Sequence, residues 1–238
     1  MSVHLSQTKK VVVIPTYNNP KTIARVAKDV IDLGYELIIV DDGSYTKVAD
    51  LVSPHPRLTL LRHEINLGKG QAILTGAKKV KEFGFDYFVS MDGDGQHLAS
   101  EINKLTQAVC GHNELIIGSR NFNIDNVPTK SKVGRAFHNF WIRLNSGYPI
   151  SDSLTGFRLY PVSILDLNIK SKRFNFEAEV LVKHFWKHKK IKDVIIECYY
   201  PTPEERVSHF DNYKDTVSIT LLHLKLFLQR LFLLKGIF

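Results

Sequence analysis

The sequence has little cysteine and no long uninterrupted apolar segment. Two cysteines, Cys110 and Cys198, occur in 238 residues, and they form neither a disulfide framework nor zinc-ligand spacing. We therefore expect a reducing, cytosolic environment. Residues 1–10 lack the apolar core of a signal peptide, and no segment supplies the roughly 18 charge-free apolar residues of a membrane span. These absences argue against a disulfide-stabilised secreted domain and against a simple membrane-spanning protein.

Acidic residues are also scarce, 24 against 32 lysines and arginines, which gives a net charge of +8. A hydrophobic fraction of 44% and a charged fraction of 24% are typical of a globular chain, and this length suits one large α/β domain. A basic cluster suits nucleic acid, an anionic membrane or a phosphorylated substrate, and a solvated surface explains it equally well. The segment 170–192 holds eight of the cations: Lys170, Lys172, Arg173, Lys183, Lys187, Lys189, Lys190 and Lys192.

Apolar β-type runs alternate with segments of helical periodicity along most of the chain. This alternation predicts an α/β fold, in which one mostly parallel sheet has helices on both faces. The expected strands are 11–14, 37–40, 58–61, 87–91, 115–117 and 194–200, and a turn within 151–160 leads into a further short strand. The expected helices are 21–33, one that opens from the glycine-rich loop 66–72 and runs to about 83, 100–109, 130–145 and 176–188.

Three of the predicted strands end in polar residues: Tyr17, the pair Asp41 and Asp42, and the sequence Asp92-Gly93-Asp94. The carboxyl ends of parallel strands meet at one edge of a sheet, so these side chains should converge on one site. Two carboxylates with Gln96 close behind are oxygen ligands suited to Mg²⁺ or Mn²⁺. A turn that caps a helix accounts for such a pair about equally well.

A glycine-rich loop, Gly68-Lys69-Gly70, precedes the second helix and resembles a phosphate cradle without matching the full P-loop pattern. A plain helix start is an equal alternative. Carboxylates for a base or ribose, an aromatic ring to cover the base and a metal for a diphosphate together favour a nucleotide ligand. The residues thus indicate a metal-dependent transferase that uses a nucleotide-activated donor.

Six short motifs in order resemble the family 2 inverting glycosyltransferases of GT-A fold, and within them the dolichol-phosphate mannose synthase-like branch. The resemblance covers roughly residues 10–212. The motifs are Pro15-Thr16-Tyr17-Asn18, Val40-Asp41-Asp42-Gly43-Ser44, Asn66-x-Gly68-Lys69-Gly70, Asp92-Gly93-Asp94-Gly95-Gln96-His97, Gly118-Ser119-Arg120 and Asp152-x-x-Thr155-Gly156-Phe157-Arg158.

The resemblance implies a role for each matching residue. The nucleotide-sugar, a UDP- or GDP-sugar, would be bound by Pro15, Tyr17, Asn19, Val40, Asp41, Asp42, Lys69, Asp92, Gly93 and Arg120. Asp92, Asp94 and Gln96 would hold Mg²⁺ or Mn²⁺. Asp152 would lie at the junction of sugar and acceptor, and Arg206, with Ser208, would grip phosphate from a loop.

The acceptor implied is a polyprenyl (dolichyl or undecaprenyl) phosphate. Such an anion needs no strong general base, whereas a sugar-hydroxyl acceptor in glycan or cell-envelope synthesis would make Asp152 the natural base. Many relatives have Glu at the position of Asn19, and the 204–208 loop lacks their usual Tyr-Gly step. Both departures concern ligand contacts.

The C-terminal segment, residues 213–238, is strongly apolar but contains several cations and lacks a clean amphipathic pattern. We expect a helix that lies at a membrane interface or packs on a membrane-protein partner, beside a catalytic domain over 1–212. A helix packed on the core is the alternative. The enzyme would then be peripheral, on the cytoplasmic face of a membrane.

Three other classes fit parts of the sequence. A nucleotidyltransferase shares the sheet and the acidic site but favours a longer basic loop after the first strand. A nucleic-acid-binding domain rests on charge alone, and we expect no nucleic-acid partner. A phosphoacceptor domain leaves Asp92 and Asp94 without a use. His184 and His188, four residues apart, suit a solvated basic face better than a zinc site.

Overall fold

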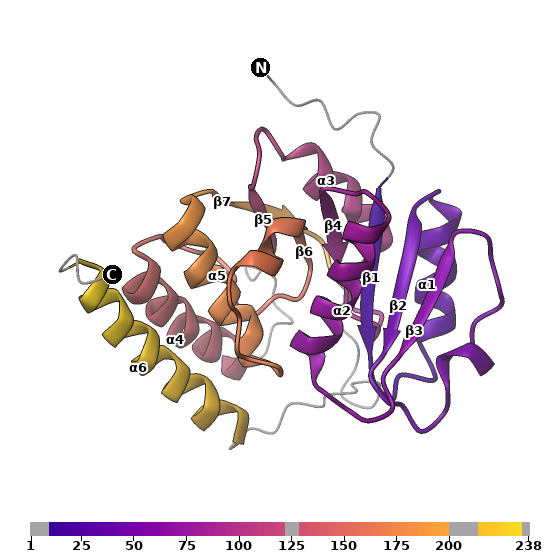
Figure 1. Cartoon of the computed structure of the whole chain (residues 1–238), viewed down its shortest axis with the longest axis horizontal. Coiled ribbons are helices and arrows are strands. Elements are labelled where there is room, and N and C mark those ends of the chain that lie inside the picture. Colours follow the sequence, from indigo (N-terminus) through magenta and orange to yellow (C-terminus); the bar gives the residue numbers. More distant parts are fainter. Residues whose placement is uncertain (1–9, 122–128, 200–213, 235–238) are drawn as a thin grey trace.

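The computed structural model describes residues 10–121, 129–199 and 214–234 (Figure 1). One sheet of seven strands runs through the molecule in the order β3-β2-β1-β4-β6-β5-β7. Its strands are β1 (Val11–Thr16), β2 (Glu36–Asp41), β3 (Leu58–Arg62), β4 (Tyr87–Ser90), β5 (Leu115–Arg120), β6 (Arg158–Pro161) and β7 (Ile191–Ile196).

All neighbouring strands run parallel except β6, which pairs antiparallel with both β4 and β5. The predicted α/β fold with a mostly parallel sheet is confirmed. The polar ends of β1, β2 and β4 lie on adjacent strands, because β1 sits between the other two. This order places the predicted ligand residues at one edge of the sheet.

Helices cover both faces of the sheet. They are α1 (Ile23–Asp32), α2 (Lys69–Glu82), α3 (Ile102–Gln107), α4 (Thr129–Ser146), α5 (Asn175–His188) and α6 (Lys214–Leu234), with short 3₁₀ helices η2 (Val48–Asp50), η3 (Ala99–Glu101) and η4 (Val162–Asp166).

The continuous apolar run of β1 has a separate partner for each face, because successive side chains of a strand point to opposite sides. Val11 and Val13 join the core cluster that includes α2 and α5, whereas Val12 and Ile14 join the cluster that includes α1 and α3. All four are at most 2% exposed. The run therefore packs into both cores and fixes the position of the loop that follows β1 and begins at Tyr17.

The last strand differs from its prediction. A strand over 194–200 was expected, but β7 spans Ile191–Ile196 because it pairs with β5 from Leu115↔Ile191 onward. Beyond Ile196 the chain leaves β5 and forms an isolated antiparallel bridge between Cys198 and His97. Pairing partners, which periodicity does not show, set the register of this strand.

Helices α4, α5 and α6 pack against one another beside the sheet and form a layer that we call the helical layer (Figure 1). The side chains by which α6 packs on α4 and α5 include the buried Ile219, His223 and Leu226. No helix in the described part of the chain is both long and apolar enough to cross a membrane.

Candidate functional site

The predicted convergence of strand ends is present as a cavity of about 500 Å³ at the carboxyl edge of the sheet. Loops after β1, β2, β3 and β4 contribute to it, as does the segment before α5. Its lining comprises Pro15, Thr16, Tyr17, Asn19, Asp42, Asn66, Gly68, Lys69, Asp92, Gly93, Asp94, Gln96, Arg173 and Phe174. Nine of the residues predicted to bind nucleotide-sugar or metal are thus neighbours: Pro15, Tyr17, Asn19, Asp42, Lys69, Asp92, Gly93, Asp94 and Gln96.

Asp42 shapes the glycine-rich loop as well as lining the cavity. Its carboxylate accepts hydrogen bonds from the backbone N–H groups of Leu67 (2.9 Å) and Gly68 (2.8 Å), and it lies 2.7 Å from His63 Nδ1. Gly68 has φ +100°, and a Cβ there would come within 2.5 Å of the Lys172 carbonyl oxygen. One carboxylate therefore fixes the loop from which Lys69 begins α2.

Asp41 and Val40, also predicted to bind the donor, lie outside the cavity lining. Asp41 is 3% exposed and accepts hydrogen bonds from the N–H groups of Ser44 and Val48, and its carboxylate also pairs with Arg62. Val40 is fully buried in the core. The structure gives both residues a supporting position under the loops, with Asp42 as the acidic residue that reaches the cavity.

The loop after β1 is held to the loop after β2. Asn18 takes a left-handed conformation (φ +53°), and its N–H donates to Ser44 Oγ at 2.9 Å. Its side-chain oxygen accepts from the N–H of Tyr45 at 2.9 Å. The ring of Tyr17, next to Asn18, lies 6.4 Å from that of Tyr45. These contacts present Tyr17 at the cavity wall, where an aromatic face suits a planar base.

Asp92, Asp94 and Gln96 follow β4 in a tight turn. Asp94 accepts a hydrogen bond from the N–H of Gln96 at 3.0 Å. Burial and the neighbouring Asp92 raise the pKa of Asp94 to about 6. Two carboxylates that repel each other beside an amide oxygen are a donor set that a hard divalent ion would stabilise. These residues fit Mg²⁺ or Mn²⁺, with remaining positions for water or phosphate oxygens. Within the described ranges no three His, Cys, Asp or Glu side chains are grouped as metal ligands, so this donor set consists of two carboxylates and an amide.

Lys69 lies between two carboxylates. Its ammonium is 2.7 Å from Asp92 Oδ1 and 2.7 Å from Glu177 Oε1, and Glu177 comes from the first turn of α5. Burial favours the neutral amine, but the two carboxylates outweigh it and hold the pKa of Lys69 well above its usual value. Gly156 passes directly beneath, since a Cβ there would come within 2.5 Å of Lys69 Nζ and 2.6 Å of Asp92 Oδ2. Glycine is needed at this position for the ion pair to form.

His97, which follows the acidic motif, has a local role. It is 6% exposed, its ring stacks on Phe157 with 5.1 Å between centroids, and its Nδ1 accepts a hydrogen bond from the N–H of Asp92 at 3.3 Å. Burial lowers its pKa to about 4, so the ring is neutral at physiological pH. His97 therefore supports the backbone of Asp92.

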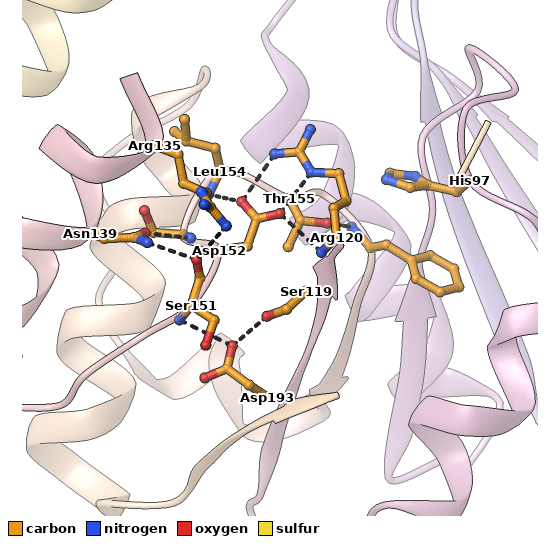
Figure 2. A network of polar contacts seen from close by, with 12 residues as sticks. His97, Ser119, Arg120, Arg135, Asn139, Ser151, Asp152, Leu154, Thr155 and Asp193 are labelled. Carbon is orange, nitrogen blue, oxygen red and sulfur yellow. Dashed lines mark hydrogen bonds and ion pairs between the residues drawn. The ribbon is translucent and has the colours of Figure 1, made fainter. Parts of the chain in front are cut away.

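Asp152 and Arg120 form a second centre (Figure 2). Asp152 is fully buried, and both of its oxygens accept from the Arg120 guanidinium, Oδ2 from Nε at 2.7 Å and Oδ1 from Nη2 at 3.0 Å. The N–H groups of Arg120 and Leu154 add bonds of 3.3 Å each. Burial tends to raise the pKa of Asp92, but nearby positive charge lowers it overall. Lys69 makes the largest lowering contribution, followed by His97 and then Arg120. The field of Arg120 thus links this centre to the acidic turn.

The loop that carries Asp152 is fixed from two sides (Figure 2). On one side, Asn139 of α4 donates to the Ser151 carbonyl at 2.7 Å and accepts from the Ser153 N–H at 3.0 Å. On the other, Ser119 donates to Asp193 at 2.5 Å, and Asp193 also accepts from the N–H of Ser151. Helix α4 and strand β7 therefore position Asp152 jointly. Arg206 and Ser208, predicted to grip phosphate, lie outside the described residues.

Several site residues were missed from the sequence. Glu177 and Phe174 were not predicted, and Arg173 was predicted only as part of the basic segment, yet all three reach the site. The concentration of cations at 170–192 was a usable signal for Arg173. Of the histidine pair, His184 is fully buried, so the predicted solvated basic face is wrong for it.

The family model described as Glycosyl transferase family 2 matches residues 11–167. The chain belongs to this family. It is a glycosyltransferase, and the predicted family and enzyme class are confirmed.

Curated relatives of this family member have defined substrates. The chain is 31% identical over 194 residues to UDP-N-acetylglucosamine–dolichyl-phosphate N-acetylglucosaminyltransferase of Methanococcus voltae, covering 71% of this chain and 77% of that protein. It is 29% identical over 199 residues to undecaprenyl-phosphate mannosyltransferase of Micrococcus luteus, covering 77% and 81% of the two chains.

Solved structures of the same fold include glucosyl-3-phosphoglycerate synthase of Mycobacterium tuberculosis, crystallised with Mn²⁺, UDP and phosphoglyceric acid. The TM-score is 0.67 at 15% identity, with 94% of this chain and 78% of that chain covered. This likeness confirms the predicted GT-A fold of the glycosyltransferase.

Proposed function

We propose that this glycosyltransferase moves a sugar from a UDP- or GDP-sugar to a polyprenyl phosphate, with inversion at the anomeric carbon and with Mg²⁺ or Mn²⁺ as cofactor. The names of the two curated relatives above, both transferases to lipid phosphates, support the acceptor class. A phosphate oxygen of the acceptor would bond to the anomeric carbon from the side opposite the nucleoside diphosphate. The bond from that carbon to the diphosphate oxygen would break.

The observation that carries the acceptor assignment is the state of Asp152. Its carboxylate is fully buried and accepts three hydrogen bonds from Arg120, two of them from the guanidinium. Both carboxylate oxygens are already engaged by Arg120, so this carboxylate is not available to an acceptor hydroxyl unless Arg120 moves. An acceptor that is already an anion needs no proton removed, whereas a sugar hydroxyl does. Asp152 therefore fits the role of orienting Arg120 toward substrate.

The donor would occupy the 500 Å³ cavity. Tyr17 and Asp42 supply an aromatic face and a carboxylate for base and ribose, and Lys69 supplies a cation for the diphosphate. Asp92, Asp94 and Gln96 would hold the divalent ion, which when bound neutralises charge on the diphosphate leaving group. Arg206 belongs to the same proposal as a phosphate-binding residue.

The outer face of α6 supports membrane association of residues 213–238, with 1–212 as the catalytic domain. Exposed apolar side chains recur there at helical spacing: Val217, Leu221, Leu224, Leu228, Leu231 and Phe232 are each between 41% and 61% exposed. Phe137 and Phe140 of the neighbouring α4 are 43% and 59% exposed. Helix α6 has one buried and one exposed apolar face, and it is not long and apolar enough to span a bilayer. Such a helix suits the interface of a membrane. The enzyme would thus be a peripheral membrane protein.

A transfer screen tests the activity. Purified protein is given radiolabelled UDP- and GDP-sugars with Mn²⁺ or Mg²⁺, with polyprenyl phosphate or with soluble glycan acceptors. We expect organic-extractable product that requires both the metal and the lipid phosphate. Label transferred to glycan hydroxyls, and none to the lipid, would replace this acceptor with the alternative of cell-envelope glycan synthesis.

Flotation with liposomes tests the membrane surface. We expect the double variant Leu221→Glu/Leu228→Glu to lose binding that the wild type shows to vesicles with anionic lipid. The matched control is Lys47→Glu/Lys81→Glu, which changes exposed residues on other elements. Equal flotation of the α6 variant and the wild type would contradict membrane association. If the α6 variant instead lost binding to a purified membrane protein, that result would favour a membrane-protein subunit.

A further inference from the structure

The ion pair between Lys69 and Asp92 occupies the place where the proposed metal site begins. Asp92 is one of the two carboxylates available to a divalent ion, yet its Oδ1 is 2.7 Å from the Lys69 ammonium. A cation already neutralises this ligand in the protein without metal. A divalent ion bound to Asp92 would therefore compete with the Lys69 ammonium for the same negative charge.

Glu177 gives Lys69 a second anchor that the metal does not need. Its Oε1 is also 2.7 Å from Lys69 Nζ, and it lies outside the cavity lining with its side chain 8% exposed. No other hydrogen-bond partner for this Oε1 occurs among the described residues. An unpaired buried carboxylate is strongly unfavourable, so the Glu177–Lys69 ion pair should persist when a metal ion binds Asp92.

The surroundings keep the three groups close. Gly156 leaves no room for a side chain beneath the ion pair, and the buried Arg158 donates to the Glu177 carbonyl at 3.0 Å, which fixes the start of α5. Lys69 is at the first position of α2, so its backbone is held by the helix and only its side chain has to move.

Resting on the proposed function, we infer that Lys69 is an internal cation that holds Asp92 in the metal-free enzyme and releases it when a divalent ion binds. Glu177 retains Lys69 during the exchange and keeps its ammonium at the cavity wall, where it faces the donor diphosphate. Lys69 and Glu177 are thus positioning residues that set the affinity for metal before the donor arrives. Asp92 thus keeps a positive partner throughout, because the divalent ion replaces the ammonium.

Removal of Lys69 is expected to raise the affinity for metal. A lysine that only contacts donor phosphate would not change metal binding in the absence of donor. An internal competitor would, and its removal would strengthen metal binding. Loss of Glu177 would have the opposite effect, because Lys69 would then lose its second anchor and the site would lose a negative charge.

The test measures Mn²⁺ binding to donor-free protein by electron paramagnetic resonance and calorimetry. For Lys69→Met we expect the Mn²⁺ affinity to rise about tenfold, and for Glu177→Gln to fall by a similar factor. The matched control Lys78→Met removes one charge from an exposed position of the same helix and should stay within about twofold of wild type. Unchanged or weaker Mn²⁺ binding by folded Lys69→Met would overturn the inference.

A second variant covers the case in which Lys69→Met does not fold with Glu177 left unpaired. The double variant Lys69→Met/Glu177→Gln removes both charges and should bind Mn²⁺ more tightly than Glu177→Gln alone. Equal or weaker binding would overturn the inference. Asp94→Asn in each background assigns the binding to this site. If wild type has no Asp94-dependent Mn²⁺ site, the proposed metal dependence fails together with the inference, whereas an Asp94-dependent site that ignores Lys69 overturns the inference alone.

Discussion

The loops at the carboxyl edge of the sheet and the helical layer treat buried polar groups in opposite ways. In the loops, Asp42 accepts hydrogen bonds from backbone N–H groups, and Lys69 helps to keep Asp92 ionised against the opposing effect of burial. In the helical layer, His223 is fully buried and stacks on Trp141 with 5.7 Å between ring centroids. Burial lowers the pKa of His223 to about 4, so it is neutral at physiological pH. Charge is kept where an anionic donor must bind, and it is excluded where three helices must pack.

The difference extends to hydrogen bonding. The carboxylates of Asp42 and Asp94 accept hydrogen bonds from backbone N–H groups of their loops, so the site is built before substrate arrives. In the layer, Asn145 donates to His223 Nδ1 and to its carbonyl, both at 3.2 Å, while Trp141 Nε1 and His223 Nε2 have no partner among the described residues. The layer is therefore held mainly by apolar packing around a neutral histidine.

The largest effect should come from the acidic turn. Asp94→Ala removes a proposed metal ligand, and the loss of roughly 4 kcal/mol of leaving-group stabilisation corresponds to a fall of about 1,000-fold in turnover. Circular dichroism should show the same fold. The control Asp32→Ala changes an exposed aspartate of α1. Near-wild-type turnover of Asp94→Ala with metal present would remove the metal from the proposed function.

The next effect tests the acid sensitivity of the layer. The pKa of His223 is depressed from 6.5 to about 4 by burial, so between these values the unfolded state binds more protons than the folded state. Stability is then fully present above pH 6.5 and is lost as the pH falls toward 4, by about 3 kcal/mol for this residue.

Urea unfolding across this range checks the prediction. His223→Gln should lower stability at pH 7.5 but flatten its decline with acid, compared with His55→Gln, which changes an exposed histidine. Parallel pH profiles for wild type and His223→Gln would show that the buried histidine is not the source of the acid sensitivity.

Asp152→Asn should act on transfer and leave donor binding alone. The asparagine keeps the shape but loses the charge that holds Arg120, and we expect a fall of about 100-fold in transfer to polyprenyl phosphate, or roughly 2.7 kcal/mol. Affinity for UDP or GDP, measured by calorimetry, should change less than about twofold, because Asp152 lies outside the cavity lining. A parallel loss of transfer activity and of nucleotide affinity would show that Asp152 also supports donor binding.

The smallest effect should come from the outer face of α6. Leu228 is 56% exposed and buries little apolar surface, so Leu228→Ser should change the free energy of unfolding by less than about 0.5 kcal/mol. Its matched control is Leu226→Ala on the buried face of the same helix, which should cost about 3 kcal/mol. Similar losses for both, measured in urea, would mean that the outer face packs on protein.

Sequence alone determined the sheet, most of its elements and the place of the site. Apolar runs such as 11–14 must be buried on both faces, and a parallel arrangement follows from the alternation with helices. The polar residues after β1, β2 and β4 could be placed together because parallel strands end at one edge. The motifs around Asp92 added the family, which residue spacing by itself left open.

Only the tertiary structure decided which of these polar residues reach the cavity and which serve as supports. Asp41 and Asp42 are adjacent in sequence, yet one is bound by Ser44, Val48 and Arg62 while the other lines the cavity, because successive residues at a strand end point to opposite sides. Glu177 meets Lys69 across more than a hundred residues of chain, and Arg120 takes both oxygens of Asp152. Such pairings depend on long-range packing, which local sequence does not encode.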